Sequence, residues 1–309
     1  MPIYRNEISV TPALTIVIPT VCSEARANSL LRAIESARSS SKEPLIVLVV
    51  ANGPQVSDGL YAGIEKLPDV TCLRLPDGSL PLALLAGRSH VNTEFFSFLD
   101  DDDELLPGSS DARLEVLRED PTADVSVLNG YREIAGSLTL MNPNMQGIDD
   151  APLKMILKRN WFASCSSVFR TATVGVEMFE APQAYAEWTW LALRLSLMNR
   201  KFVAIDSPGY VVHDTPLSLS KNRRYFESYI GLFDRMLEED LPDWARRCVV
   251  SKRCDALHDL SHQALHTGDH LRAWSMHLKS LRSFRGLKYI FYTRHLLVGL
   301  MLRRHPSES

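Results

Sequence analysis

The sequence predicts an α/β fold: a mixed, mostly parallel sheet with helices on both faces, followed by an all-helical region. Two observations support this prediction. Within the first 100 of 309 residues, short continuous apolar segments alternate with segments whose apolar residues recur at helical spacing. From about residue 223 onward only helical patterns follow. We therefore predict an α/β domain over residues 1–222 and a helical region with a basic tail over residues 223–309.

Each predicted element has a local signal. Apolar runs closely followed by proline, glycine or aspartate are typical of buried strands that end in loops, and they occur at residues 14–18, 45–50, 70–75 and 95–99. Helical spacing predicts helices over residues 23–39 and 80–91. The later predicted elements are strands at 125–128, 137–141, 164–169, 202–205 and 210–212, helices at 150–159 and 187–198, and a helical hairpin that turns at 268–269.

The charge of the chain is segregated along the sequence. The total is −3, from 34 Lys+Arg and 37 Asp+Glu. Residues 270–309 hold eight basic residues and one acidic residue, a net charge of +7, which leaves −10 for the first 269 residues. An acidic body excludes nucleic acid as its ligand, whereas the basic tail suits an acidic surface such as a membrane. The 45% apolar and 23% charged residues are those of a globular protein and exclude disorder.

The cysteines and the N-terminal segment bear on the compartment. The five cysteines form no CxxC motif, which favours free thiols over a disulfide framework or a zinc site. No signal-peptide pattern and no uncharged apolar run of about 18 residues is present. We expect a cytoplasmic protein, at most peripheral at the inner face of a membrane.

The residues that follow the first, second and fourth predicted strands are the candidate ligand-binding residues. In parallel sheets, ligands bind beyond the carboxyl ends of the strands, where the strand order reverses. Four consecutive aspartates, Asp100 to Asp103, come directly after a buried strand. Carboxylates there can hold Mg²⁺ or Mn²⁺ through oxygen ligands. The alternative is a solvated acidic turn that caps the next helix.

Four sequence elements in this order resemble the inverting glycosyltransferases of family 2, which have the GT-A fold. The resemblance covers roughly residues 14–220 and implies a nucleoside-diphosphate sugar donor (a UDP-sugar is favoured), a divalent cation (Mn²⁺ or Mg²⁺) and a saccharide or lipid-linked acceptor hydroxyl. It also implies a role in cell-surface polysaccharide or glycoconjugate assembly. The four elements are Ile18-Pro19-Thr20, Val49-Val50-Ala51-Asn52-Gly53, Gly87-Arg88-Ser89 and Phe98-Leu99-Asp100-Asp101-Asp102-Asp103.

The resemblance implies roles for individual residues on the donor side. One departure concerns Ala51, which stands where the family often has an aspartate that contacts the base, so the nucleotide base stays open. Carried over by position, Pro19, Thr20 and Glu24 line the base and ribose pocket, Asn52 lies beside the base, Arg88 approaches the nucleotide, Asp100 faces the ribose, Asp101 belongs to the same donor-binding set, and Asp102 binds the metal.

On the acceptor side the resemblance implies a general base at a helix start. Glu187 occupies the position of the aspartate in the family's Glu-Asp pair, and Ala186 replaces the glutamate. A carboxylate there can remove a proton from an acceptor hydroxyl; the alternative is a first-turn acid stabilised by the helix dipole. His213, after a later strand, is either a metal ligand or structural. Lys221 or Arg223 could offset the charge of the phosphates from a loop.

Several alternatives stay open at this point. A sugar nucleotidyltransferase normally has a glycine-rich loop after the first strand, and residues 19–24 contain no glycine. A non-catalytic nucleotide-sugar-binding protein fits the departures at Ala51 and Ala186. The predicted helix at residues 287–304 either packs on the protein or mediates a homo-oligomer, or it lies on an anionic lipid surface.

Overall fold

A computed structural model describes residues 11–180, 183, 185–215 and 223–302, with side chains throughout except at residues 223–225 and 299–302. The chain forms two compact units. We call them the sheet unit, which comprises residues up to 182 together with 187–216, and the helical unit, which comprises residues 183–186 and those from 217 onward. We predicted a boundary after residue 222. Residues 216–222 lie outside the described residues.

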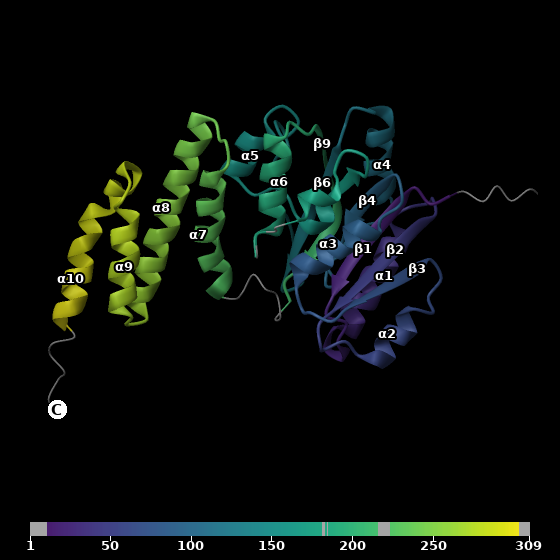
Figure 1. The fold of residues 1–309 in the computed structure, drawn as a ribbon, viewed down its shortest axis with the longest axis horizontal. Helices are drawn as coiled ribbons and strands as arrows, with labels where there is room; N and C mark the ends of the chain where they lie inside the picture. Colours follow the sequence, from purple (N-terminus) through teal and green to yellow (C-terminus); the bar gives the residue numbers. More distant parts are fainter. Residues whose placement is uncertain (1–10, 181–182, 184, 216–222, 303–309) are drawn as a thin grey trace, which may run out of the picture. The chain divides into compact units, whose positions relative to one another are not determined.

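The sheet unit is built on one mixed sheet with the strand order β3-β2-β1-β4-β8-β6-β9-β5, and β7 pairs with β6 (Figure 1). Strands β1 to β4 are mutually parallel, whereas β8 runs antiparallel to both β4 and β6. The strands are β1 (Leu14–Thr20), β2 (Leu45–Asn52), β3 (Val70–Leu75), β4 (Phe95–Phe98), β5 (Glu104–Leu105), β6 (Val125–Ile134), β7 (Ser137–Leu140), β8 (Ser167–Arg170) and β9 (Phe202–His213).

Helices cover both faces of the parallel strands because successive side chains of a buried strand point in opposite directions. Ile16 and Ile18 pack with the buried side chains of α1. Between them, Val17 points the other way and lies against Gly87 of α3, where an added Cβ would come within 2.4 Å of it. The sheet-unit helices are η1 (Glu24–Arg26), α1 (Ala27–Ser39), α2 (Asp58–Ile64), α3 (Leu80–His90), α4 (Ser109–Glu119), α5 (Pro152–Lys158), η2 (Ser164–Ser166), η3 (Val176–Met178) and α6 (Glu187–Leu197).

The strand order places the reversal point of the sheet at β1. The chain proceeds from β1 outward to β2 and β3, then returns to place β4 on the opposite side of β1. The loops that follow β1 and β4 therefore leave the same edge in opposite directions, which is where α/β proteins bind ligands. Thr20 ends β1, and the four aspartates begin two residues after β4.

The helical unit consists of α7 (Arg223–Glu238), α8 (Asp243–His266), α9 (His270–Ser280), η5 (Phe284–Tyr292) and α10 (Thr293–Leu302). The predicted hairpin between α8 and α9 is confirmed, and Gly268 takes a positive φ of 77° at the turn. Among the described helices, none combines the length and the apolar character that crossing a membrane requires.

The structure differs from the predicted elements in several places. The helix predicted at 287–304 is divided between η5 and α10, and the strand predicted at 125–128 extends to Ile134 as β6. The two short strands predicted at 202–205 and 210–212 are one strand, β9, whose pairing with β6 contains register shifts. Residues 164–166 form a 3₁₀ turn before β8 begins, not the start of a strand. The sequence analysis did not identify α2 or β5, which are only seven and two residues long.

Candidate active site

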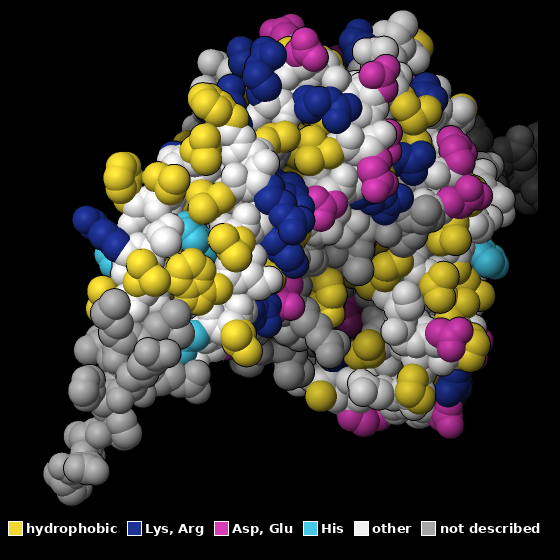
Figure 2. Space-filling model, turned by 60° about the vertical axis from the view of Figure 1, so that its left-hand side comes forward, with side chains coloured by type: hydrophobic (Ala, Val, Ile, Leu, Met, Phe, Trp, Pro, Cys, Tyr) yellow, Lys and Arg dark blue, Asp and Glu magenta, His cyan; other side chains and the backbone are white. Residues whose placement is uncertain are grey.

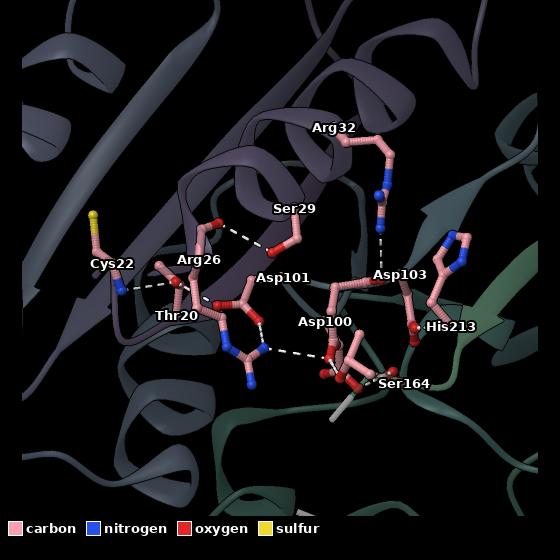
Figure 3. A network of polar contacts seen from close by, with 12 residues as sticks. Thr20, Cys22, Arg26, Ser29, Arg32, Asp100, Asp101, Asp103, Ser164 and His213 are labelled. Carbon is pink, nitrogen blue, oxygen red and sulfur yellow. Dashed lines mark hydrogen bonds and ion pairs between the residues drawn. The ribbon is translucent and has the colours of Figure 1, made fainter. Parts of the chain in front are cut away.

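The first contact of the candidate site joins the ends of β1 and β4 (Figure 3). The Thr20 hydroxyl donates a hydrogen bond of 2.6 Å to Asp101 Oδ2, although the two residues are 81 positions apart in the sequence. The backbone N–H of Cys22 donates to the Thr20 hydroxyl at 2.9 Å. Thr20 and the aspartate run lie together because β1 and β4 pair in parallel.

Arg26, in the 3₁₀ turn after β1, bridges two aspartates. Its Nη1 lies 2.5 Å from Asp101 Oδ1 and 3.3 Å from Asp102 Oδ2. The Thr215 hydroxyl donates to the same Oδ2 of Asp102 at 2.7 Å. Burial raises the pKa of Asp101, and the charge of Arg26 and the Thr20 hydrogen bond act in the opposite direction.

Asp100 and Asp103 form the second half of the cluster and receive polar contacts from neutral groups. Ser164 Oγ donates to Asp100 at 2.8 Å, and the backbone N–H of His213 donates to Asp103 at 3.1 Å. Burial, followed by repulsion from Asp102, raises the pKa of Asp100 to about 7. Burial also raises the pKa of Asp103 well above its ordinary value, and repulsion from Asp100 adds to the effect.

The His213 side chain lies between two glutamates. Its Nδ1 is 2.5 Å from Glu133 Oε2, and its Nε2 is 2.7 Å from Glu104 Oε1. Both ring nitrogens therefore contact carboxylates outside the aspartate run, and only the backbone of His213 reaches Asp103. Arg32 joins the same group through a 2.7 Å ion pair with Glu104.

The other donor-side residues fall into two places. Asn52 is buried and donates from Nδ2 to the Thr20 carbonyl at 2.8 Å, so it joins the edge formed by β1 and β4. Pro19 lies within β1 and is buried, and Glu24 accepts a hydrogen bond from Ser57 Oγ at the start of α2.

The contacts of the Arg88 guanidinium are with backbone carbonyls and an aromatic ring. The buried guanidinium donates to the carbonyls of Val174 and Thr171 at 2.9 to 3.0 Å. It also lies over the Phe96 ring, 4.6 Å from the centroid. Burial lowers the pKa of Arg88. These contacts tie α3 to the loop after β8 and account for a buried arginine without a ligand.

Glu187 begins α6 and lines a small hollow of about 20 Å³ with Trp188, Trp190 and Phe179. Its charge contributes to the raised pKa of Asp100, so the two carboxyl groups lie within electrostatic range. The structure thus brings the predicted base to the same edge of the sheet as the aspartate run. Lys221 lies outside the described residues, as does the side chain of Arg223.

The sequence analysis missed four side chains that contact the aspartates. Arg26, Ser164, Cys165 and Thr215 each reach one or two of the four carboxylates. Only Arg26 had a detectable signal, because it is the first basic residue after the strand that ends at Thr20. Within the described part of the chain, no three side chains of His, Cys, Asp or Glu form a group that could hold a metal ion.

A parallel half-sheet with carboxylates at its reversal point, joined to an antiparallel strand, is the architecture of a GT-A-type glycosyltransferase. The model of glycosyl transferase family 2 matches residues 15–170, just over half of the 309 residues, and the chain belongs to this family. A search of curated protein sequences gave no match.

Solved structures of S. aureus TarS have a similar fold. The TarS 1-349 structure is 13% identical with a TM-score of 0.56, and the match covers 87% of this chain and 81% of that one. The structure of TarS 1-349 in complex with UDP-GlcNAc is 14% identical with a TM-score of 0.54, covering 84% and 75%. These matches confirm the predicted fold, and the family model confirms the predicted family.

Proposed function

We propose that the protein is a metal-dependent inverting glycosyltransferase that moves a sugar from a nucleoside-diphosphate sugar to an acceptor hydroxyl. The observation that carries the proposal is the convergence of Thr20, Asn52 and the aspartate run on one edge of the sheet, at its reversal point. Glu187 lies within electrostatic range of this edge. Family membership supports sugar transfer as the reaction.

The donor is proposed to be a UDP-sugar. Structures of TarS with UDP-GlcNAc and with UDP share the fold, and the second is 14% identical with a TM-score of 0.51. Asn52 offers an amide close to the end of β1, which can pair with the edge of a base. The acceptor is proposed to be a saccharide or a lipid-linked sugar used in cell-surface polymer or glycoconjugate assembly.

The oxygen donors at the edge fit a hard divalent cation. Mg²⁺ and Mn²⁺ accept one or two carboxylates and fill their remaining positions with water and phosphate oxygens. Asp102 is proposed as the ligand, with Asp100 adjacent. Burial and then repulsion from Asp102 raise the pKa of Asp100, and a nearby positive charge would stabilise the ionised carboxylates against both effects. When bound, the cation would neutralise the departing diphosphate.

Glu187 is proposed to act as the general base. Its carboxylate accepts the proton of the acceptor hydroxyl while the hydroxyl oxygen bonds to the anomeric carbon from the face opposite the diphosphate. The bond between the anomeric carbon and the diphosphate oxygen breaks in the same step, and the nucleoside diphosphate leaves with the electron pair of that bond. The anomeric configuration therefore inverts. Arg26, already paired with Asp101 and Asp102, supplies a fixed positive charge beside the diphosphate site.

Glu187→Gln tests this function. We expect kcat for transfer from a UDP-sugar to fall about 10²- to 10⁴-fold, since the amide cannot accept the proton. Donor affinity, measured by calorimetry with UDP and Mn²⁺, should change little. Glu177→Gln is the matched control because Glu177 is an exposed acid ten residues earlier, and it should keep full turnover.

Equal turnover in the native protein and Glu187→Gln would overturn the assignment of the base. If a broad panel of nucleotide sugars with Mn²⁺ or Mg²⁺ gave neither transfer nor hydrolysis while UDP still bound, the protein would be a nucleotide-sugar-binding protein. A stereochemical analysis of the product by NMR separates inversion from retention.

A further inference from the structure

We propose that the C-terminal part of the helical unit is a docking surface for an anionic lipid bilayer. The surface consists of residues 271–298, which span α9, η5 and the first half of α10. This inference concerns a region outside the candidate active site and does not rest on the proposed function.

The first observation is a concentration of exposed apolar side chains. Sixteen large apolar residues of the described chain are exposed, and half of them lie within these 28 residues. Leu271 and Phe284 are each 87% exposed, and Phe291 is 78% exposed. The other five are Leu278, Leu287, Ile290, Leu297 and Val298. Large exposed apolar groups in contiguous positions mark interaction surfaces, whereas isolated ones do not.

The second observation is the charge of the same segment. Residues 270–302 contain six basic residues and no acidic residue. A run of this length with a single sign of charge is attracted to the negative surface of a membrane that contains anionic lipids. Five of the six cations are in positions 279–294 and are exposed: Lys279, Arg282, Arg285, Lys288 and Arg294. Lys288 forms an ion pair with Asp255, and the sixth cation, Arg272, forms one with Glu227.

The third observation is the distribution of side chains over the three faces of η5. A 3₁₀ helix has three residues per turn, so every third residue shares a face. Gly286, Tyr289 and Tyr292 form the inner face: an added Cβ at Gly286 would meet the Ser280 carbonyl at 1.7 Å, and Tyr289 donates to Asp255 at 2.8 Å. The outer face follows at the same spacing and is Phe284, Leu287 and Ile290. The third face carries Arg285, Lys288 and Phe291.

The inner face shows that this segment is packed in a fixed orientation. Leu296 of α10 is fully buried against Ala264 and Ala273, with Tyr292 and Trp274 beside it. The outer apolar residues are therefore held outward by the packing of the inner ones. Apolar groups with basic neighbours on one side of a helix are typical of interfacial helices, which lie in the plane of the headgroups.

Figure 2 shows the arrangement on the surface: hydrophobic side chains gather over the C-terminal helices at the left of the view, with Lys and Arg side chains at the borders of the group. A neutral apolar partner would not need these cations, and a basic partner would be repelled by them. Charge complementarity therefore favours an anionic bilayer over a second copy of the chain, whose same surface carries the same positive charge.

Co-sedimentation of the full chain with lipid vesicles tests the proposal. We expect binding to vesicles of phosphatidylcholine mixed with phosphatidylglycerol, and much weaker binding to phosphatidylcholine alone. Raising the salt to about 1 M, where the Debye length is about 3 Å, should release most of the protein. The double variant Phe284→Ser/Phe291→Ser should bind at least about tenfold more weakly, and Arg285→Gln about fivefold more weakly.

A matched control comes from the sheet unit. Leu138 and Leu140 of β7 are also exposed apolar residues, and Leu138→Ser/Leu140→Ser should bind vesicles like the native protein. Because all these side chains are exposed, circular dichroism and the thermal midpoint should stay unchanged in both double variants. Equal sedimentation of the native protein and Phe284→Ser/Phe291→Ser would overturn the proposal. So would a concentration-dependent dimer in light scattering that this variant abolishes while vesicles bind no protein.

Discussion

The sheet unit and the helical unit bury opposite kinds of ionisable side chain. At the edge of the sheet, burial raises the pKa of Asp100 and Asp103. Inside the helical unit, burial lowers the pKa of His258 and His277. Both shifts have one physical cause, because a low-dielectric interior disfavours whichever form is charged. The two units should therefore respond to acid in opposite directions.

The surroundings of these groups differ more than their burial. The carboxylates lie among other carboxylates with Arg26, hydroxyl groups and backbone N–H groups around them. His277 is packed among the Trp274 and Tyr292 rings, with Nε2 2.9 Å from the Thr293 hydroxyl. Neighbouring carboxylates that repel one another are suited to bind a cation, because its charge offsets the repulsion. A neutral imidazole among aromatic rings contributes to packing instead.

The largest expected effect concerns turnover. Asp102→Asn should lower kcat/KM for UDP-sugar transfer at least about 10²-fold, because the amide is a poor ligand for a divalent cation and leaves the diphosphate charge less well neutralised. Turnover and Mn²⁺ affinity should fall together when both are measured by titration. Glu115→Gln, which removes an exposed carboxylate on α4, should change neither.

His277→Gln is the comparison from the other unit and should keep native turnover. The distinction between a reactive edge and a packed interior would fail if the loss in His277→Gln matched the loss in Asp102→Asn.

The sequence predicts those features of the site that depend on strand pairing. Thr20 and Asp101 end up in contact because continuous apolar runs predict parallel strands, and parallel strands place their carboxyl ends together. Arg26 was not predicted, because its bridge depends on the angle at which the 3₁₀ turn leaves β1. That angle has no counterpart in hydrophobic periodicity.

Side-chain direction limited the other predictions. Arg88 matched a family motif, yet its guanidinium donates hydrogen bonds to the carbonyls of Thr171 and Val174. These two residues lie in a loop more than 80 positions later in the sequence. The ring of His213 likewise points to Glu104 and Glu133, whereas its backbone contacts Asp103. Motif order locates a residue in the fold, but the long-range partners that orient its side chain have no local signal.

The next effect is the pH dependence of the sheet unit without added metal. The folded pKa of Asp100, about 7, lies above its ordinary value of 3.8, so the folded state holds a proton that the unfolded chain releases between about pH 4 and pH 7. The free energy of unfolding should therefore fall as pH rises through this window. One full proton would change it by about 1.4 kcal/mol per pH unit, and we expect a total of about 2 kcal/mol because the neighbouring carboxyls share that proton.

Hydrogen exchange of the β1 and β4 amides between pH 5 and pH 8, corrected for the intrinsic rate, measures this slope. Asp100→Asn should reduce it, because the amide does not titrate, and Asp103, whose pKa is also raised, should account for the slope that remains. A sheet unit that becomes more stable as pH rises from 5 to 7 would contradict the raised pKa.

The smallest effect is the opposite slope of the helical unit. His277 has a lowered pKa in the folded state, so the unfolded chain binds a proton more readily below about pH 6.5. The stability that the neutral, buried ring contributes is present above this pH and is lost as pH falls below it. His277→Gln should reduce the acid sensitivity measured by exchange of the α8 and α9 amides, and His258 should account for the remainder. His90→Gln, on an exposed face of α3, should leave it unchanged. If acid destabilised the α8 and α9 amides equally in all three proteins, His277 would not be the source, and the contrast between the two units would rest on the sheet edge alone.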